Sequence, residues 1–294
     1  TDMLRGEAGT TLELRFQRPG EKEPRTVHIT RRTIQLPAIP YYGIMDDGIG
    51  YINLNSFTSG CAREMRHALL QLMSQGAKAL VLDIRDNVGG AINEAVDITN
   101  LFLPKGVKVV YTKGKQASMN HEYSTTTDPI APDMPLVVLV NGMSASSSEI
   151  VSGALQDMDR AVIMGTRTFG KGLVQAIRDV PYRGELKITT GRYYIPSGRC
   201  IQAHEYNHDG SSKIIPDSLR STFYTKAGRP VTDGGGIQPV SVILNDTLPT
   251  MIYDLVQSDI FFDWATDFAS RHPAIDAPGE FHLTDSVYDA FCKY

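Results

Sequence analysis

Apolar and polar residues alternate along the first part of the chain. Residues 11–17 (TLELRFQ) and 26–30 (TVHIT) each place the two kinds of side chain on opposite faces of an extended strand. The segment RPGEKEP between them contains proline and glycine, which favour a turn. The pattern predicts a two-stranded hairpin, which buries too little apolar surface to be stable alone.

The pattern changes after the proline-containing linker LPAIPYYG (residues 36–43), where extended and helical segments begin to alternate. The runs ALVLDI and LVVLV are typical of strands that are covered on both faces. Strand patterns occupy residues 48–57, 79–84, 136–140, 161–164 and 186–195, and helical patterns occupy residues 61–75, 91–103 and 149–158. This order predicts an α/β domain with a largely parallel sheet flanked by helices.

Residues after 246 show helical spacing and contain the only tryptophan. We expect this segment to form a helical extension that packs on the core. The predicted boundaries are therefore residues 1–35 for the hairpin region, 36–245 for the core and 246–294 for the extension.

Composition excludes several classes of protein. With 294 residues, 41% hydrophobic and 21% charged, the chain resembles an ordinary globular protein. A net charge of -4 gives no basic surface for nucleic acid, and no apolar run is long enough to span a membrane. Three widely spaced cysteines form no metal-binding pattern. Since the chain does not begin with methionine, we expect it to be part of a longer protein.

The segment GTRTFGKG (residues 165–172) has the G-x-x-x-x-G-K spacing of a phosphate-binding loop. Such a loop precedes a helix whose N-terminus faces the phosphates. Here Pro181 and Gly184 follow, and Gly172 stands where the motif needs a hydroxyl for Mg²⁺. The sequence therefore argues against phosphate binding.

The segment HEYNH (residues 204–208) matches the zinc-protease motif H-E-x-x-H. That motif requires a helix, so that two histidines one turn apart reach one metal ion. A strand pattern precedes this segment and the turn Asp209–Gly210 follows it, which favours a polar loop. A zinc site made by His204, Glu205 and His208 remains the alternative interpretation.

A cluster of serines lies between the strand LVVLV and the next predicted helix, in the segment VNGMSASSSEIVSGALQD. A hydroxyl at such a junction lies beside the free N–H groups of the helix N-terminus, which stabilise developing negative charge. This is the arrangement of a nucleophile elbow, although the sequence is not G-x-S-x-G. Alternatively, one of these serines only caps the helix.

A catalytic serine needs a base, and no histidine lies at a comparable strand end. A lysine can accept the proton when its surroundings keep the amine neutral near pH 7. Lys171 follows the strand at residues 161–164, which comes directly after the serine-bearing helix. We therefore expect Lys171 to lie near the serines.

These two segments together resemble the C-terminal processing peptidases, also called tail-specific proteases, which are serine endopeptidases with a Ser/Lys pair. The family pattern Asn-x-x-Ser/Thr-Ala-Ser-x-Ser-Glu aligns on residues 141–149, and Phe-Gly-Lys-Gly-x-x-Gln aligns on residues 169–175. The resemblance implies that Ser146 is the nucleophile, that Lys171 is the general base and that Gln175 orients the lysine.

Further blocks of the same family occur in the family's order between residues 44 and 239: GIGYINLNSFTSG, GAKALVLDIRDNVGG, LKITTGRYYIPSGRCIQ and DGGGIQP. The resemblance implies a ClpP/crotonase-like protease core. It also implies an oxyanion hole made by the backbone N–H of Ser147 and one from the Gly-Gly loop. For that loop we choose Gly89, with little to separate it from Gly90.

Residues 3–34 resemble the last part of the PDZ domain that these enzymes carry, so the hairpin is interpreted as a truncated PDZ domain. Two features depart from the family. Val240 replaces an aspartate, and the polar stretch at residues 205–222 is long. Four residues of extended strand also span about 13 Å, so Gln175 reaches Lys171 only if the backbone bends, for example at Gly172.

The sequence thus predicts a serine endopeptidase that cleaves proteins or peptides near their C-termini through an acyl-enzyme, with no metal or other cofactor. We expect its partners to be protein or peptide substrates bound by their C-terminal region. The resemblance implies a location in the bacterial periplasm or cell envelope. The alternatives are a zinc metallopeptidase and a non-catalytic peptide-binding scaffold.

Overall fold

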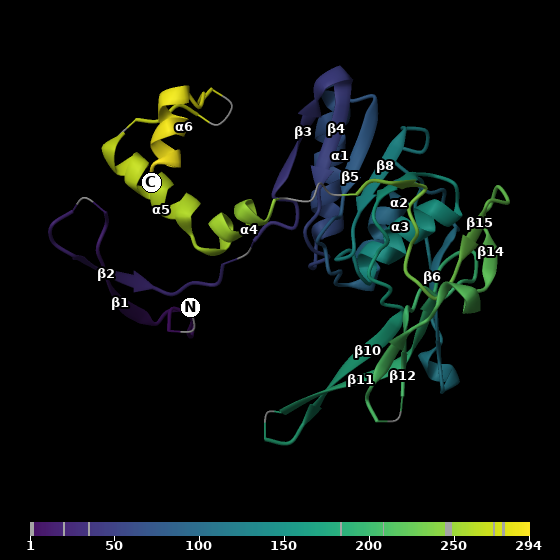
Figure 1. Ribbon diagram of the computed structural model, residues 1–294. Coiled ribbons are helices and arrows are strands. Elements are labelled where there is room, and N and C mark those ends of the chain that lie inside the picture. The colour runs from purple at the N-terminus through teal and green to yellow at the C-terminus, as the bar shows by residue number, and fades with distance from the viewer. Residues whose placement is uncertain are drawn as a thin grey trace. The chain divides into compact units, whose positions relative to one another are not determined.

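The computed structural model describes residues 3–19, 21–34, 36–182, 184–207, 209–244, 249–272, 274–277 and 280–294 (Figure 1). The chain divides into two compact units. One unit is Leu36–Leu244, and the other combines Thr1–Gln35 with Asn245–Tyr294.

A six-stranded mixed sheet forms the centre of the larger unit, in the order β16-β9-β8-β5-β4-β3. Its strands are β3 (Tyr41–Met45), β4 (Ile49–Asn53), β5 (Ala79–Asp83), β8 (Leu136–Val140), β9 (Val162–Gly165) and β16 (Ser241–Val242). All neighbours are parallel except β3 and β4. The predicted α/β class and largely parallel sheet are confirmed.

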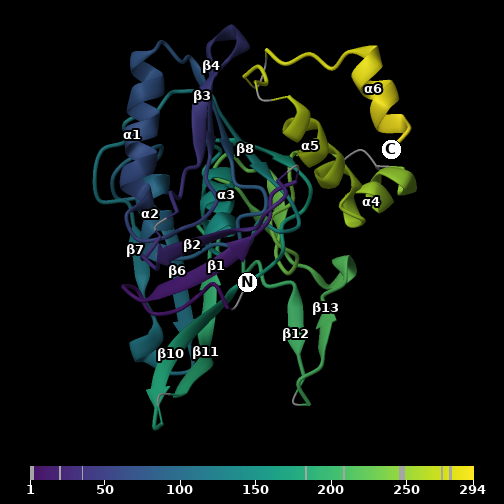
Figure 2. The ribbon, with the colours of Figure 1, turned by 90° about the vertical axis from the view of Figure 1, so that its left-hand side faces the viewer.

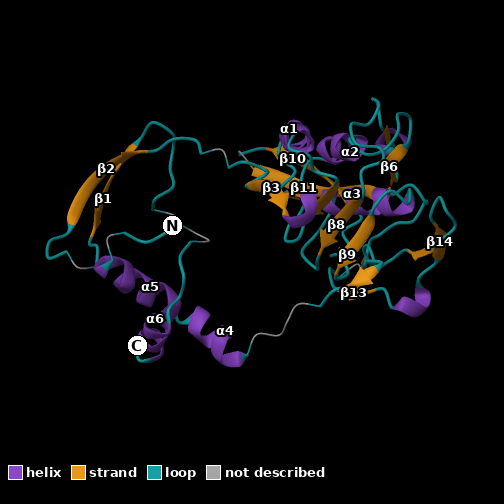
Figure 3. Cartoon of the chain, turned by 90° about the horizontal axis from the view of Figure 1, so that it is seen from above, coloured by secondary structure: helices purple, strands orange, loops and turns teal. Residues whose placement is uncertain are grey.

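Three helices lie on one face of this sheet: α1 (Cys61–Ser74), α2 (Ile92–Asn100) and α3 (Ser147–Asp157) (Figure 3). Helix α1 packs on β3 and β4, α3 packs on β9, and α2 contacts both helices. Met65, Leu69 and Leu72 of the apolar stripe that predicted α1 are buried, whereas Met73, also expected in that stripe, is exposed. Leu136, Val138 and Val140 of β8 are buried as well. The core therefore lies between the helices and the sheet.

A second, antiparallel sheet has the order β10-β11-β6-β7. Its strands are β10 (Leu173–Val180), β11 (Gly184–Tyr194), β6 (Lys108–Gly114) and β7 (Glu122–Ser124). The predicted strand at residues 186–195 belongs to this sheet rather than to the parallel one, and β6 was not predicted. Strand β10 is an edge strand.

The remaining strands of this unit form two short hairpins, made by β12 (His204–Tyr206) with β13 (Ser212–Ile214) and by β14 (Thr222–Tyr224) with β15 (Pro230–Thr232). The long polar stretch noted in the sequence contributes β13 and the 3-10 turn η3 (Asp217–Leu219); similar turns are η1 (Asp46–Gly48) and η2 (Ala117–Met119). In Figure 2 the β10–β11 and β12–β13 hairpins extend in the same direction.

A buried ion pair joins the end of α3 to the segment after β11. The Arg199 guanidinium donates hydrogen bonds to Asp157 Oδ1 at 2.8 Å, to Gln156 Oε1 at 2.7 Å and to the Thr232 carbonyl at 3.0 Å. Both charged side chains are almost fully buried. Removing one partner of such a pair is strongly destabilising because the other charge remains buried.

The described residues of the smaller unit form the predicted hairpin, β1 (Thr11–Phe16) paired with β2 (Arg25–Thr30), and the helices α4 (Thr250–Gln257), α5 (Ile260–Arg271) and α6 (Asp285–Cys292). Trp264 and Phe291 join α5 to α6, with ring centroids 5.3 Å apart. The helical character of the C-terminal segment is confirmed, while its packing on the core stays a prediction. In the described ranges no helix is both long and apolar enough to cross a membrane.

Candidate active site

The loops that follow β5, β8 and β9 carry the predicted functional residues. Because these neighbouring strands are parallel, their carboxyl ends meet at one edge of the sheet. Ligand and catalytic sites of open α/β sheets form at this edge. The loops are residues 84–91, 141–146 and 166–172.

Ser146 lies at the sharp turn between β8 and α3. Its backbone has φ 58° and ψ -114°, a conformation that is strained for any residue with a side chain. Strain of this kind costs about 1–3 kcal/mol and is concentrated at functional sites. A strained strand-to-helix turn that presents a serine is the arrangement of a nucleophile elbow. The structure therefore distinguishes Ser146 from the neighbouring serines.

The neighbouring Ser144 and Ser148 form hydrogen bonds within the folded core. Ser144 Oγ donates to the Ile84 carbonyl at 2.8 Å, and Ser148 Oγ donates to the Asn87 carbonyl at 2.7 Å. Both residues are fully buried. These two hydroxyls connect the turn after β8 to the loop after β5.

Asn87 holds the loop after β5 against the Ser146 turn. Its side chain donates to the Leu54 carbonyl at 2.7 Å, and its carbonyl accepts the N–H of Ala145 at 3.0 Å. Its Oδ1 accepts the N–H of Gly89 at 2.9 Å. The residue is completely buried, so the loop position is rigidly defined.

Gly89 lies directly against the turn. A Cβ at this position would be 2.8 Å from Ser146 Cβ and 2.9 Å from Ser147 N, and the backbone has φ 97°. Only glycine fits both the conformation and the space.

We predict that Gly89→Ala lowers kcat for peptide cleavage at least about 100-fold, because the added methyl group displaces Ser146 and misplaced catalytic groups lose this much rate. Gly106→Ala is the matched control, since Gly106 has φ 84° but has open space around its Cβ position. Both variants carry the same backbone strain, so equal losses of activity would contradict the prediction.

Two backbone N–H groups near Ser146 are free to bind an oxyanion. The N–H groups of Ser147 and Gly90 donate to no acceptor among the described residues, whereas that of Gly89 donates to Asn87. Gly90 is exposed and lines the cavity, whereas Gly89 is buried. The Ser147 hydroxyl donates to the Gly90 carbonyl at 2.9 Å, which holds the two residues together.

The Glu149 carboxylate connects the nucleophile turn to the lysine loop. Its Oε2 accepts the N–H groups of Ser146 and Lys171, both at 2.9 Å. Its Oε1 accepts the Thr168 hydroxyl at 2.6 Å and the N–H of Gly170 at 2.7 Å. Two segments that are distant in the sequence are therefore held by one carboxylate.

Complete burial raises the pKa of Glu149 to about 7, although the four hydrogen bonds to the carboxylate lower it. Burial is the larger effect because it removes the charged form from water.

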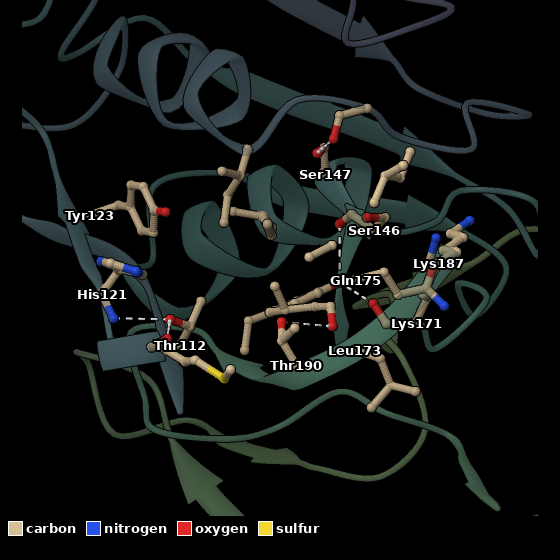
Figure 4. Close-up of a pocket in the computed structure, with 18 of the residues that line it drawn as sticks. Thr112, His121, Tyr123, Ser146, Ser147, Lys171, Leu173, Gln175, Lys187 and Thr190 are labelled. Carbon is tan, nitrogen blue, oxygen red and sulfur yellow. Dashed lines mark hydrogen bonds between the residues drawn. The ribbon is translucent and has the colours of Figure 1, made fainter. Parts of the chain in front are cut away.

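Ser146, Ser147, Lys171 and Gln175 all line one cavity of about 840 Å³ (Figure 4). Strand β10 forms one wall, with a bulge between Val174 and Gln175, so the expected backbone irregularity lies near Gln175 rather than at Gly172. The hydrogen bonds of the described residues include none between the side chains of Ser146 and Lys171, or of Lys171 and Gln175. In enzymes without bound substrate, hydrogen bonds between catalytic groups are often long or poorly aligned.

Residues 48–217 match the model of peptidase family S41. The chain belongs to this family. Residues 251–294 match a second model, described as the C-terminal helical domain of a probable PDZ-protease.

Named relatives of this S41 chain agree with the family match. It is 39% identical to the carboxy-terminal-processing protease of Bartonella bacilliformis over 68% of this chain and 46% of that protein. It is also 39% identical to the carboxyl-terminal-processing protease of a Picosynechococcus species, over 74% of this chain and 50% of that protein. The chain thus spans about half the length of these relatives.

The fold is similar to a solved structure, the photosystem II D1 C-terminal processing protease. The TM-score is 0.55 at 28% identity, covering 86% of this chain and 60% of that one. The predicted resemblance to C-terminal processing peptidases is confirmed by these comparisons.

The zinc-protease motif lies elsewhere and has the wrong local structure. His204 and Glu205 belong to strand β12, where successive side chains point to opposite faces. His208 lies outside the described residues. Over the part of the chain that the structure describes, no three histidine, cysteine or acidic residues are grouped as metal ligands would be.

Reasoning from the sequence did not assign roles to Glu149, Asn87 or Tyr193. The spacing of Ser146 and Glu149 matches the S-x-x-E of a capping box, so Glu149 could have been found. Tyr193 is buried and its hydroxyl contacts the carbonyls of Lys171 and Ser146, the latter at 3.3 Å. No sequence signal predicts that contact because it joins β11 to two distant loops.

Proposed function

We propose that this chain is the core of a serine endopeptidase that cleaves proteins or peptides near their C-termini. One observation carries the proposal: the backbones of Ser146 and Lys171 are held on the same Glu149 carboxylate, and both residues line one cavity. Membership of the S41 family and the names of the relatives support it.

In the proposed mechanism the Ser146 hydroxyl attacks the scissile carbonyl carbon while neutral Lys171 accepts its proton. The tetrahedral intermediate collapses as the C–N bond breaks, and the protonated lysine gives its proton to the departing amine. Water then attacks the acyl-enzyme, again with Lys171 as the base. The products are two peptides and the free enzyme.

We propose Ser147 and Gly90 as the oxyanion-hole donors. The sequence favoured Gly89, but its N–H is used by Asn87 and is therefore not free to bind a substrate oxygen. Each donor of this kind contributes on the order of 3 kcal/mol to stabilising the transition state. Gln175 remains the proposed residue that orients Lys171.

The finer assignments are also proposals. Residues 36–245 would form a ClpP/crotonase-like core, and residues 1–35 would be the end of a PDZ domain. The description of the matching C-terminal helical family as that of a PDZ-protease supports the latter. We further propose that substrates are bound by their C-terminal region and that the protein acts in the periplasm or cell envelope.

The proposal is tested by incubating the protein with an unstructured polypeptide and identifying the products by mass spectrometry. We expect fragments cut near the C-terminus, and an acyl adduct on the peptide that contains Ser146 after an acid quench. Cleavage that chelators abolish, or peptide binding without cleavage, would contradict the Ser/Lys mechanism.

A further inference from the structure

Two arginine side chains meet at Gly235, in the glycine-rich segment that follows β15. A Cβ on Gly235 would lie 2.5 Å from Arg220 Nη1 and 2.7 Å from Arg167 Nη1. The two Nη1 atoms are therefore at most about 5 Å apart, because each lies close to the same point. Gly235 has no side chain, and this absence allows both guanidinium groups to occupy the position.

The positive charge of this pair is only partly compensated. The Arg220 side chain is 7% exposed, and the carboxylate that pairs with it, Asp217, is 80% exposed. Arg220 Nη2 also donates to the Ile215 carbonyl at 3.0 Å. Its Nε is buried and has no acceptor among the described residues. A largely buried guanidinium therefore keeps an unused donor.

The positive charge of Arg167 is compensated even less than that of Arg220. Its Nη1 donates a long hydrogen bond of 3.3 Å to the Gly235 carbonyl, and it forms no ion pair within the described ranges. Burial and the charge of Arg220 lower the pKa of Arg167, and the exposed Asp217 carboxylate, which pairs with Arg220, opposes this only in part. Two like charges at this distance repel each other, so a bound anion would stabilise the pair.

The arginine pair is connected to the proposed catalytic loop. Thr168, next to Arg167, donates its N–H to the Ile237 carbonyl at 3.1 Å and accepts the Ile237 N–H on Oγ1 at 2.6 Å. The same Thr168 hydroxyl donates to Glu149, which holds Ser146 and Lys171. An occupant of the arginine pair would lie near the loop that carries the base.

We propose that Arg167 and Arg220 form a binding site for a carboxylate or a comparable oxyanion. Guanidinium groups bind two-oxygen anions through paired, charge-assisted hydrogen bonds. The N–H of Gly235 donates to no acceptor among the described residues and is a third available donor. One source of the anion is the α-carboxylate of a peptide, which rests on the proposed function. The other is a free inorganic anion.

The test compares a labelled peptide with a free C-terminal carboxylate and the same peptide with a C-terminal amide. Dissociation constants are measured in the Ser146→Ala background, so that binding is read without cleavage. We expect the acid to bind about tenfold more tightly than the amide, and this ratio to fall to about one in Arg167→Gln. Arg66→Gln, on the exposed face of α1, is the control for the loss of one positive charge.

Gly235→Ala is the second variant, because its methyl group displaces both guanidinium groups without removing a charge. We expect it to lower the preference for the acid peptide over the amide peptide, as Arg167→Gln does. A ratio that persists in both variants would overturn the proposal, since the carboxylate would then be recognised elsewhere. Because binding is measured in the Ser146→Ala background, this result does not depend on whether the parent protein cleaves peptides.

A measurement with inorganic phosphate shows whether the site binds a peptide carboxylate or a free inorganic anion. If acid and amide bind equally, yet phosphate raises the melting temperature of the parent protein and not of Arg167→Gln, the site binds a free anion. If phosphate has no such effect and the peptides bind equally, the arginine pair is not an anion site.

Discussion

Lys171→Ala is expected to lower kcat for peptide cleavage by at least about 10⁴-fold, and Ser146→Ala by a similar factor. In the proposed mechanism the two residues act as a unit, because the serine is a poor nucleophile until a base removes its proton. The double variant should therefore lose little more than either single variant. Single-turnover cleavage of a labelled peptide measures the chemical step directly.

Lys187→Ala is the matched control, because Lys187 is a second lysine that lines the same cavity. Its removal changes the charge of the cavity but not the proposed base, so we expect less than a tenfold effect. Circular dichroism of each variant checks that the fold is intact. If Lys171→Ala kept more than a tenth of the parent activity, another group would have to be the base.

Glu149→Ala is expected to lower the free energy of unfolding by at least about 3 kcal/mol. The carboxylate accepts four hydrogen bonds, and each buried donor that loses its acceptor costs about 1–3 kcal/mol. The variant also releases the backbones of Ser146 and Lys171 from each other, so kcat should fall as well. Urea unfolding is best followed by circular dichroism, since the only tryptophan, Trp264, lies in the other unit.

Glu149 also predicts a pH dependence of stability. Its pKa is about 7 in the folded chain, above the ordinary value of 4.5. The folded state therefore holds a proton that the unfolded state has lost between these values, and stability falls as the pH rises through this range. The decrease amounts to about 3 kcal/mol between pH 4.5 and pH 7.5.

The non-titrating variant Glu149→Gln isolates this contribution. The difference in unfolding free energy between the parent and the variant should become smaller as the pH rises. If the unfolding free energies of the two proteins changed with pH in parallel, the Glu149 carboxylate would already be ionised at low pH. The four hydrogen bonds would then lower its pKa more than burial raises it.

Local patterns predicted much of the fold because they report which face of an element is buried. The stripe Met65, Leu69, Leu72 and Met73 predicted α1, and the run at residues 136–140 predicted β8. The strand at residues 186–195 was predicted but not its sheet, since strand pairing depends on partners that are distant in the chain. Strand β6, which pairs with it, was missed altogether.

The sequence by itself determined the family and predicted the chemistry that we propose. A serine cluster at a strand-to-helix junction, a lysine after the next strand and several blocks in the order of one family pointed to Ser146 and Lys171. These signals are local, so they can be read without knowing the fold. The same reasoning proposed Gly89 for the oxyanion hole but could not separate it from Gly90 on physical grounds.

Only the tertiary structure decided how these parts are held. Asn87 uses the Gly89 N–H and leaves that of Gly90 free, and Glu149 joins two loops through four hydrogen bonds. The meeting of Arg167 and Arg220 at Gly235 is likewise invisible in the sequence. Glu149 reaches Gly170 and Lys171, and Arg167 meets Arg220, only after folding brings distant parts of the chain together. The Asn87–Gly89 bond is local in the chain, but it depends on a loop conformation that no sequence pattern specifies.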